Sequence, residues 1–255
     1  MGDEQQMASI ENTPSLDPLF VDRYVGDKLG SLKMLMDAGP PWHGFIHKLT
    51  QGTYHDEWER AWQYRQVMLG HPRYGVDFWD GYYHFLDLNQ DPVRQADYFW
   101  RSMLRIGGEK QGTIWAMVDV ERGGQRAIPS ARRVFDCVGR WAERYEMLSG
   151  WKPTRYGGEL LRALGIHVAG GPENLLGCGR SAIALYGAKL TVGVIEATGT
   201  DPRHLLFWQY DGDGEAHLEG YPREAPGFGP SDISAMVLPG GLPSLRRALQ
   251  AERRV

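Results

Sequence analysis

The sequence predicts an α/β fold, a modified TIM-like barrel in which parallel β/α units are followed by antiparallel strands. Short apolar segments alternate with amphipathic helical segments up to about residue 188, and this alternation favours a parallel sheet. Beyond residue 203 the pattern changes to that of a hairpin. The length of 255 residues also suits one barrel domain of this kind.

Six apolar segments are the candidate strands of the parallel part. They lie at residues 19–25, 42–49, 76–86, 113–120, within 153–158, and at 181–188. The segment 203–221 is expected to form the hairpin, with its turn at Asp211–Gly214.

Helical segments separate the strands, and they are expected at residues 28–39, 56–70, 91–108, 129–150, 158–166 and 243–254. The second begins with acids and ends at Gly70, as the helix dipole favours. Pro92 suits the first turn of the third. In the fourth, apolar side chains recur at helical spacing: Val134, Val138, Trp141, Tyr145 and Leu148.

The chain divides into a tail, a barrel and a last helix. Residues 1–16 are polar and are expected to form a flexible tail, residues 17–240 the barrel, and residues 241–255 a C-terminal helix packed on it or extending from it. The first residues lack the basic and apolar stretches of a secretory signal, and no apolar run could span a bilayer. We therefore expect a protein made in the cytoplasm without a signal peptide and without membrane insertion.

Charge and cysteine content exclude some classes of function. The formal net charge of −4 lacks the basic balance of a nucleic-acid binder, so no nucleic-acid partner is expected. Cys137 and Cys178 are too few for a disulfide framework and have no metal-binding spacing, although a single disulfide between them stays open. The nine Trp and twelve Tyr residues suit either a large core or a surface that stacks on flat ligand faces.

The stretch "WAMVDVERGG", residues 115–124, ends a predicted strand with two acids. Side chains alternate along a strand, so Asp119 and Glu121 point to the same side. At the carboxyl end of a barrel strand they would lie where barrel enzymes place catalytic groups. Two neighbouring carboxylates repel, so one keeps its proton to higher pH, which is the division of roles that glycoside hydrolysis needs.

Other interpretations of these two acids are open from the residues alone. Both could be solvated at a strand end, or paired with Arg122 and Arg126. A Mg²⁺ or Mn²⁺ site is a further alternative, and it would need another ligand such as His84. His84 follows Tyr83 on its strand and therefore points to the opposite face, which favours a buried core histidine.

Seven segments, taken in order, resemble the family 25 glycoside hydrolases, lysozymes that cut between N-acetylmuramic acid and N-acetylglucosamine. These segments are "FVDRY" (20–24), "FIHKLTQGTYHDEW" (45–58), "DGYYHFL" (80–86), "MVDVERG" (117–123), "TRYGG" (154–158), "FWQYDGDG" (207–214) and "PSDISAM" (230–236). The sequence departs from the family's pattern at Ala182, where the family tends to carry a tryptophan. It also departs in the first strand, which has "DRY" where the family usually has a small residue after an aspartate–valine pair.

The resemblance implies roles for ten residues and no cofactor or metal. It implies Glu121 as the general acid, with Asp119 beside it, and Asp22, Asp119 and Asp232 as candidates for the supporting carboxylate. Its implied substrate-binding residues are Lys48, Tyr83, Tyr156, Tyr186, Trp208 and Tyr210. For each aromatic residue taken alone, a place in the core is about equally favoured.

The resemblance implies a muramidase whose partner is bacterial peptidoglycan. Such an enzyme would act in phage-type lysis after release, or as part of a virion or tail-like particle together with other particle proteins. The alternative is a catalytically impaired barrel that binds glycan or serves as a structural part of a tail, for which Ala182 is the one hint in the sequence. A third alternative is a barrel enzyme that acts on another carbohydrate polymer.

Overall fold

The fold is a closed barrel, seen in a computed structural model that describes residues 18–23, 29–107, 115–122, 125, 127, 130–157, 160, 163–164, 176–198, 200–212, 218–237, 243–245 and 247. Its strands are β1 (Leu19–Arg23), β2 (Trp42–Gln51), β3 (His55–Asp56), β4 (Trp79–Phe85), β5 (Trp115–Asp119), β6 (Thr154–Tyr156), β7 (Arg180–Ala184), β8 (Leu205–Asp211), β9 (Glu224–Ala225), β10 (Gly229–Pro230) and β11 (Asp232–Met236). Its helices are α2 (Leu29–Asp37), α3 (Trp58–Leu69), α4 (Pro92–Arg105), α5 (Ala131–Ser149), α7 (Val192–Ala197) and a 3-10 turn at Pro202–His204.

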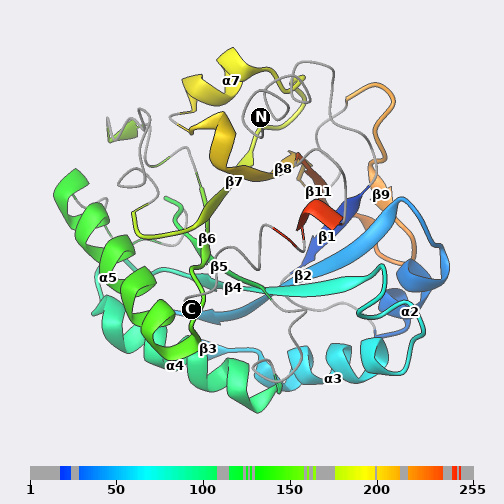
Figure 1. Ribbon diagram of the computed structural model, residues 1–255, viewed down its shortest axis with the longest axis horizontal. Coiled ribbons are helices and arrows are strands. Elements are labelled where there is room, and N and C mark those ends of the chain that lie inside the picture. The colour runs from blue at the N-terminus through cyan, green and yellow to red at the C-terminus, as the bar shows by residue number, and fades with distance from the viewer. Residues whose placement is uncertain are drawn as a thin grey trace.

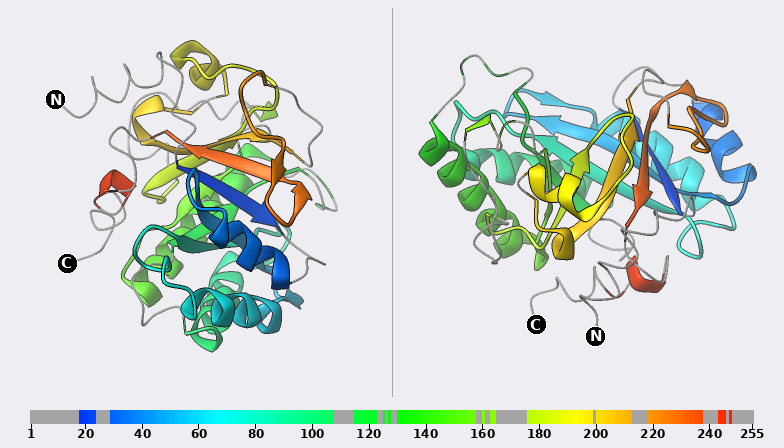
Figure 2. Two further views of the ribbon diagram at one scale, coloured as in Figure 1. Left: turned by 90° about the vertical axis from the view of Figure 1, so that its right-hand side faces the viewer. Right: turned by 90° about the horizontal axis from the view of Figure 1, so that it is seen from above.

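The sheet closes because β1 pairs with both β2 and β11. The strands follow the order β1-β11-β8-β7-β6-β5-β4-β2, and β3 extends the sheet as an antiparallel partner of β2. All neighbours around the barrel are parallel except those of β11, which runs antiparallel to β8 and to β1. The further views in Figure 2 show β11 beside β1. The predicted fold class is therefore confirmed.

One detail of the predicted order is wrong, because β8 does not form a hairpin with the residues that follow its turn. Residues 218–223 make turns rather than a strand, and residues 213–217 lie outside the described part. The antiparallel partner of β8 is β11, after an intervening short hairpin of β9 and β10. The sequence pattern missed the hairpin of β9 and β10 because each of these strands has only two residues, too few to show alternation.

Large aromatic side chains fill the inside of the barrel. The ring centroid of Phe20 lies 5.5 Å from that of Trp115 and 4.9 Å from that of Phe207. Neighbouring strands carry glycine where these rings pass. A Cβ on Gly44 would lie 2.1 Å from the Phe20 ring, and one on Gly81 would lie 2.5 Å from the Trp115 ring. Small residues beside large ones let one layer of side chains close the barrel interior.

Helices cover the outer face of the barrel. Figure 1 shows α2, α3, α4 and α5 along the outer side of the first strands, and α7 beyond β7 and β8. Asp91 caps α4 by accepting a hydrogen bond from the N–H of Val93 at 2.9 Å, and Ser130 does the same for α5 at the N–H of Arg133. Gly150 ends α5 in the left-handed conformation that glycine adopts freely.

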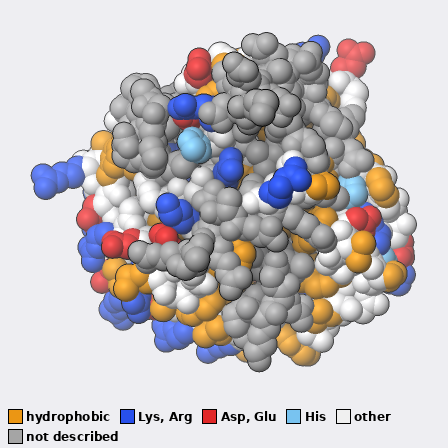
Figure 3. Space-filling model, viewed as in Figure 1, with side chains coloured by type: hydrophobic (Ala, Val, Ile, Leu, Met, Phe, Trp, Pro, Cys, Tyr) orange, Lys and Arg blue, Asp and Glu red, His pale blue; other side chains and the backbone are white. Residues whose placement is uncertain are grey.

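The outer surface of α4 and α5 carries arginines interleaved with acids. Lys and Arg side chains gather over these helices at the lower left of Figure 3. Arg144 donates to Asp97 at 2.7 Å, and Arg140 lies 3.6 Å from Asp136. The surface is therefore of mixed charge.

Three predicted elements lie wholly or mainly outside the described residues. The predicted tail, residues 1–16, lies there entirely. Of the predicted helix within 241–255, residues 243–245 and 247 are described and helical, and of that at 158–166, residues 160 and 163 are helical. Among the described residues, no helix combines the length and apolar character needed to cross a membrane.

Candidate active site

The acids at 22, 119, 121 and 232 meet at one end of the barrel. Asp22 in β1 and Asp232 in β11 are register partners in the antiparallel pair. Asp119 is the last residue of β5, and Glu121 follows after Val120. Val120 packs into the apolar cluster outside the barrel, so the acids on either side of it face inward. The negative charges of Asp232 and Glu121 both act on Asp22, which joins the two sides of the site.

Burial and mutual repulsion set the protonation of Asp119 and Asp22. Burial raises the pKa of Asp119 well above its usual range, and the charges of Glu121 and Asp22 add to the rise. Burial likewise raises the pKa of Asp22, followed by the charges of Asp232 and Glu121. Atom Oδ1 of each of these two aspartates is buried and makes no hydrogen bond within the described structure. Both acids therefore keep a proton to higher pH than an ordinary aspartate does.

Lys48 supplies a positive charge to this group of acids. It lies on β2 in register with Tyr83 on β4, and its Nζ is 5.0 Å from the centroid of the Phe85 ring. Its charge lowers the pKa of Asp22 and of Asp119, against the larger effects that raise both. Lys48 thus limits the repulsion that keeping several acids together would otherwise cause.

Three tyrosines surround the acids. Burial raises the pKa of Tyr83 well above its usual range, and the charges of Asp22 and Asp119 raise it further. The Tyr156 hydroxyl donates to Oε1 of Gln209 at 2.7 Å. Burial also raises the pKa of Tyr156 and of Tyr186. All three phenols therefore stay neutral at physiological pH and can serve as hydrogen-bond donors.

Tyr186 is the most exposed member of this group, with 51% of its surface accessible. Its ring lies against Gly212, where a Cβ would come within 2.9 Å of the ring. Glycine at this position therefore lets the ring lie over the end of β8. Tyr186 has the exposure expected of a residue that meets a ligand from solvent.

The structure brings the acids together with Lys48, Tyr83, Tyr156 and Tyr186, but not with Trp208 and Tyr210. Both of these side chains pack in the cluster outside the barrel. Their ring centroids lie 5.5 Å and 4.9 Å from that of Tyr221, and the Trp208 indole donates to the Leu185 carbonyl at 3.1 Å. The side chains of Trp208 and Tyr210 leave β8 on the outer face, away from the acids. We therefore do not include these two residues among the proposed substrate-binding residues.

Gln209 lies between them and faces the acids, and the sequence interpretation missed it. It is 3% exposed and accepts the Tyr156 hydroxyl bond. The signal was present, because Gln209 is the one polar residue in "LLFWQY". A single polar residue in a strand that is buried on both faces is a candidate for an inward position near the strand's carboxyl end.

His84 is a buried core histidine, as its alternation with Tyr83 predicts. It is fully buried, its Nδ1 lies 2.7 Å from the Thr50 hydroxyl, and its Nε2 lies 3.1 Å from Oε1 of Gln95. Burial lowers the pKa of His84 to about 3, so the ring is neutral. It stacks on Trp141 outside the barrel, with ring centroids 5.4 Å apart, and so cannot join Asp119 and Glu121 in a metal site. Among the described residues, no group of His, Cys, Asp and Glu is arranged to hold a metal ion.

Both cysteines are buried free thiols, so no disulfide joins Cys137 and Cys178.

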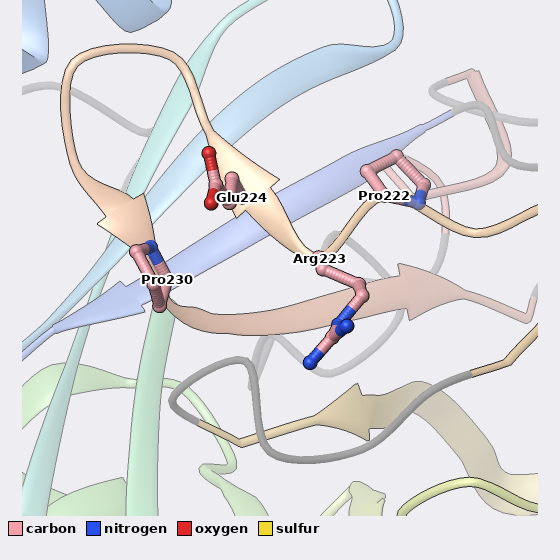
Figure 4. A pocket seen from close by; sticks show the side chains of 4 residues that line it. All are labelled: Pro222, Arg223, Glu224 and Pro230. Atoms are coloured by element: carbon pink, nitrogen blue, oxygen red, sulfur yellow. The ribbon is translucent and has the colours of Figure 1, made fainter.

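A separate hollow of about 500 Å³ lies beside the β9–β10 hairpin, lined by Pro222, Arg223, Glu224 and Pro230 (Figure 4). None of the four clustered acids lines it.

This arrangement suits acid catalysis. A half-buried carboxyl beside a buried acid whose pKa is raised can donate a proton, and further acids lie close enough to stabilise a positive charge. Neutral tyrosine hydroxyls and one amide surround them as uncharged hydrogen-bonding groups.

Comparison with known proteins gives matches among solved structures alone, since no family model and no curated protein sequence matches this chain. The bacterial lysozyme from Streptomyces coelicolor superposes with a TM-score of 0.67 at 17% identity, covering 92% of this chain and 98% of that one. A family 25 glycosyl hydrolase from Bacillus anthracis gives 0.62 at 18% identity, covering 91% and 93%. The catalytic domain of endolysin ply40 from bacteriophage P40 of Listeria monocytogenes gives 0.58 at 14% identity, covering 91% and 96%. The chain thus has the fold of the family 25 glycoside hydrolases, as the sequence segments indicated.

Proposed function

We propose that this chain is a peptidoglycan hydrolase that cleaves the β-1,4 bond between N-acetylmuramic acid and N-acetylglucosamine. The observation that carries the proposal is the meeting of Asp22, Asp119, Glu121 and Asp232 at one end of the barrel. Similarity in fold to a bacterial lysozyme and a family 25 glycosyl hydrolase agrees with it. A group of buried and half-buried acids is costly to the fold unless it is used, which favours a catalytic role over a structural one.

Glu121 is the proposed general acid, which protonates the glycosidic oxygen as the bond breaks. It is half-buried, whereas Asp119 is 5% exposed, so Glu121 is the member of the pair that a sugar can reach. Asp119 and Glu121 repel each other as carboxylates. This repulsion would make the pair keep one proton to higher pH than a single carboxyl does.

Asp22 and Asp232 are the proposed supporting carboxylates on the facing side of the site. As the positive charge develops on the sugar ring, this pair could stabilise it, orient the substrate's 2-acetamido group, or activate a water molecule. Lys48, Tyr83, Tyr156 and Tyr186 are proposed to bind the glycan, and Gln209 joins them through its bond with Tyr156. The similarity to an endolysin catalytic domain is compatible with a part in phage-type lysis or wall penetration.

A glycan-binding barrel with impaired catalysis is the second candidate, and Ala182 favours it. Ala182 pairs with Tyr156 in the register of β6 and β7 and packs in the cluster inside the barrel. A methyl group there offers little area for stacking on a sugar ring.

Mass analysis of digested peptidoglycan tests both candidates. Purified walls are incubated with the protein, and the released fragments are reduced and sequenced by tandem mass spectrometry. We expect fragments that end in reduced muramic acid. Fragments that end in reduced glucosamine would contradict the proposed bond, and binding to walls without any new reducing ends would favour the second candidate.

A further inference from the structure

A short buried segment between β4 and α4 has its backbone held mainly by side chains. Leu86 and Leu88 are both fully buried, yet residues 86–88 belong to no strand. The Leu86 N–H donates to the Asp119 carbonyl at 3.0 Å, which extends the ladder between β4 and β5 by one bond. The other backbone N–H and C=O groups of residues 86–88 form no hydrogen bonds with a neighbouring strand. Because the segment is buried, these groups need other hydrogen-bond partners.

Two glutamines and an arginine supply these partners. Gln95 pairs with both backbone groups of Asp87, accepting from its N–H at 2.9 Å and donating to its carbonyl at 2.8 Å. Gln125 accepts from the Leu88 N–H at 3.0 Å and donates to the Leu86 carbonyl at 2.7 Å. Arg133 donates to the Leu88 carbonyl at 3.1 Å. All six backbone groups of residues 86–88 are thereby satisfied.

Gln125 differs from Gln95 in one further contact. Its Nε2 also donates to the backbone carbonyl of Glu121 at 3.3 Å. One amide thus uses its oxygen and both of its hydrogens to tie the link after β4 to the link after β5. Glu121 lies beyond the end of β5, where the last backbone bond toward β6 runs from the Val120 N–H to the Tyr156 carbonyl at 3.1 Å.

We propose that Gln125 is a positioning residue for Glu121, fixing the backbone of the acid against the hydrogen-bonded 86–88 segment so that its carboxyl stays beside Asp119. The proposal rests on the proposed hydrolase function only for its kinetic consequence. A proton donor must be held close to its productive geometry, and a displacement of about 1 Å can cost about a hundredfold in rate. Gln125 touches no reacting atom, so it acts through Glu121.

The rival interpretation is that Gln125 merely satisfies buried backbone groups, and Gln95 is the matched control for it. Gln95 forms the same kind of paired bonds with the same segment, but the hydrogen bonds of its side chain run to Asp87 and His84 rather than to Glu121. Loss of either amide should destabilise the fold, because it leaves buried backbone groups without partners. Loss of Gln125 alone should move Glu121.

The test compares Gln125→Ala with Gln95→Ala in kinetics on soluble glycan fragments and in thermal unfolding. We expect Gln125→Ala to lower kcat by about tenfold to a hundredfold while KM stays within about threefold, following the cost of misplacement. We expect Gln95→Ala to lower Tm while kcat changes by less than about twofold. Equal kcat losses at equal losses of Tm in both variants would overturn the proposal. If Gln125→Ala does not fold, Gln125→Met keeps the bulk of the side chain and removes the same bonds.

A carboxyl-carbon NMR titration of Asp119 tests the same inference without any turnover. The charge of Glu121 contributes to the raised pKa of Asp119, so moving Glu121 away should lower the titration midpoint of Asp119. We expect this in Gln125→Ala and an unchanged midpoint in Gln95→Ala, and an unchanged midpoint in both would overturn the proposal. Should the wild-type protein fail to cut peptidoglycan, the proposed function fails while this titration still decides on the positioning role.

Discussion

Two buried aspartates on neighbouring strands show how differently one residue type is used on the two faces of this barrel. Asp80 on β4 faces outward and is fully buried. It accepts hydrogen bonds from Arg65 Nη1 at 2.7 Å, from the Tyr74 hydroxyl at 2.8 Å and from the Tyr82 hydroxyl at 2.9 Å. Asp119 on β5 faces inward, and its Oδ1 is buried without a hydrogen bond within the described structure.

The difference lies in what surrounds each carboxyl. Burial raises the pKa of Asp80, but Arg65 and the two hydroxyls oppose the rise. For Asp119, burial and the charges of Glu121 and Asp22 act in the same direction, with Lys48 opposing them. Asp80 therefore has the surroundings of a structural ion pair, whereas Asp119 has those of a group whose protonation is used. This contrast can be tested from both sides.

Removing the proposed acid should give the largest effect. Glu121→Gln keeps the shape of the side chain but has no proton to donate, so we expect the rate on peptidoglycan to fall by about 10²- to 10⁴-fold. Stability should stay the same or rise, because the change removes a charge that repels Asp22 and Asp119. Release of reducing ends and urea denaturation measure the two quantities. A rate within about tenfold of wild type would count against the assignment of Glu121.

Breaking the outer pair should give the opposite pattern. Arg65→Met leaves the Asp80 carboxyl buried without its cation, and we expect a loss of about 3–5 kcal/mol in the free energy of unfolding. Both side chains are at most 1% exposed, so solvent does not screen the pair. The rate per folded molecule should be unchanged, since Arg65 lies on α3 outside the barrel. A variant as stable as wild type would mean that Asp80 is supported by the tyrosines alone.

The fold and the acids were predictable from sequence to different degrees. The alternation of strands and helices predicted the barrel, and the period of two placed Asp119 and Glu121 on one side because Val120 is apolar. Only the family resemblance predicted that Asp22 and Asp232 lie close together. Neither segment has a local sequence pattern that indicates its pairing with the other. Pairing β11 with β8 was missed, since twenty residues lie between those strands.

The residues that pattern could not place are those on strands buried on both faces. Every residue of β8 is buried, so hydrophobicity does not distinguish the face of Trp208 from that of Gln209. The two glutamines that hold residues 86–88 are invisible to periodicity, because they bond backbone groups rather than form a pattern of their own. The bond from Gln125 to the Glu121 carbonyl depends on the folded structure, and no sequence pattern indicates it.

The inner acids should also change how stability depends on pH. The pKa of Asp119 in the folded protein is raised, so between the ordinary aspartate pKa of about 3.9 and this raised value the folded state binds more protons than the unfolded state. Its contribution to the free energy of unfolding is therefore greatest at low pH and falls as pH rises through that window.

Comparing wild type with Asp119→Asn isolates this contribution. Acids with lowered pKa, such as Asp37 and Asp201, give stability that increases as pH rises, so the raw curve of wild type mixes both signs. Their contributions cancel in the difference between the two proteins. We expect the stability of wild type relative to Asp119→Asn to fall as pH rises above about 4, measured by urea denaturation at each pH. A difference that grows with pH would mean that Asp119 is stabilised as a carboxylate, like an acid in an ion pair.

The smallest effects are expected from substitutions at two adjacent residues of β8, Trp208 and Gln209, whose side chains lie on opposite faces of the strand. Gln209→Met removes the acceptor of the Tyr156 hydroxyl, and losing one hydrogen bond of about 0.5–1.5 kcal/mol should lower kcat/KM by about two- to tenfold. Trp208→Phe shrinks a side chain that packs outside the barrel, so it should reduce the free energy of unfolding and leave kcat/KM unchanged. Both side chains are at most 3% exposed, so burial alone predicts no difference between them. If Trp208→Phe lowered kcat/KM as much as Gln209→Met does, the inner and outer faces of β8 would not be functionally distinct, and the substrate contact predicted for Trp208 would have to be restored.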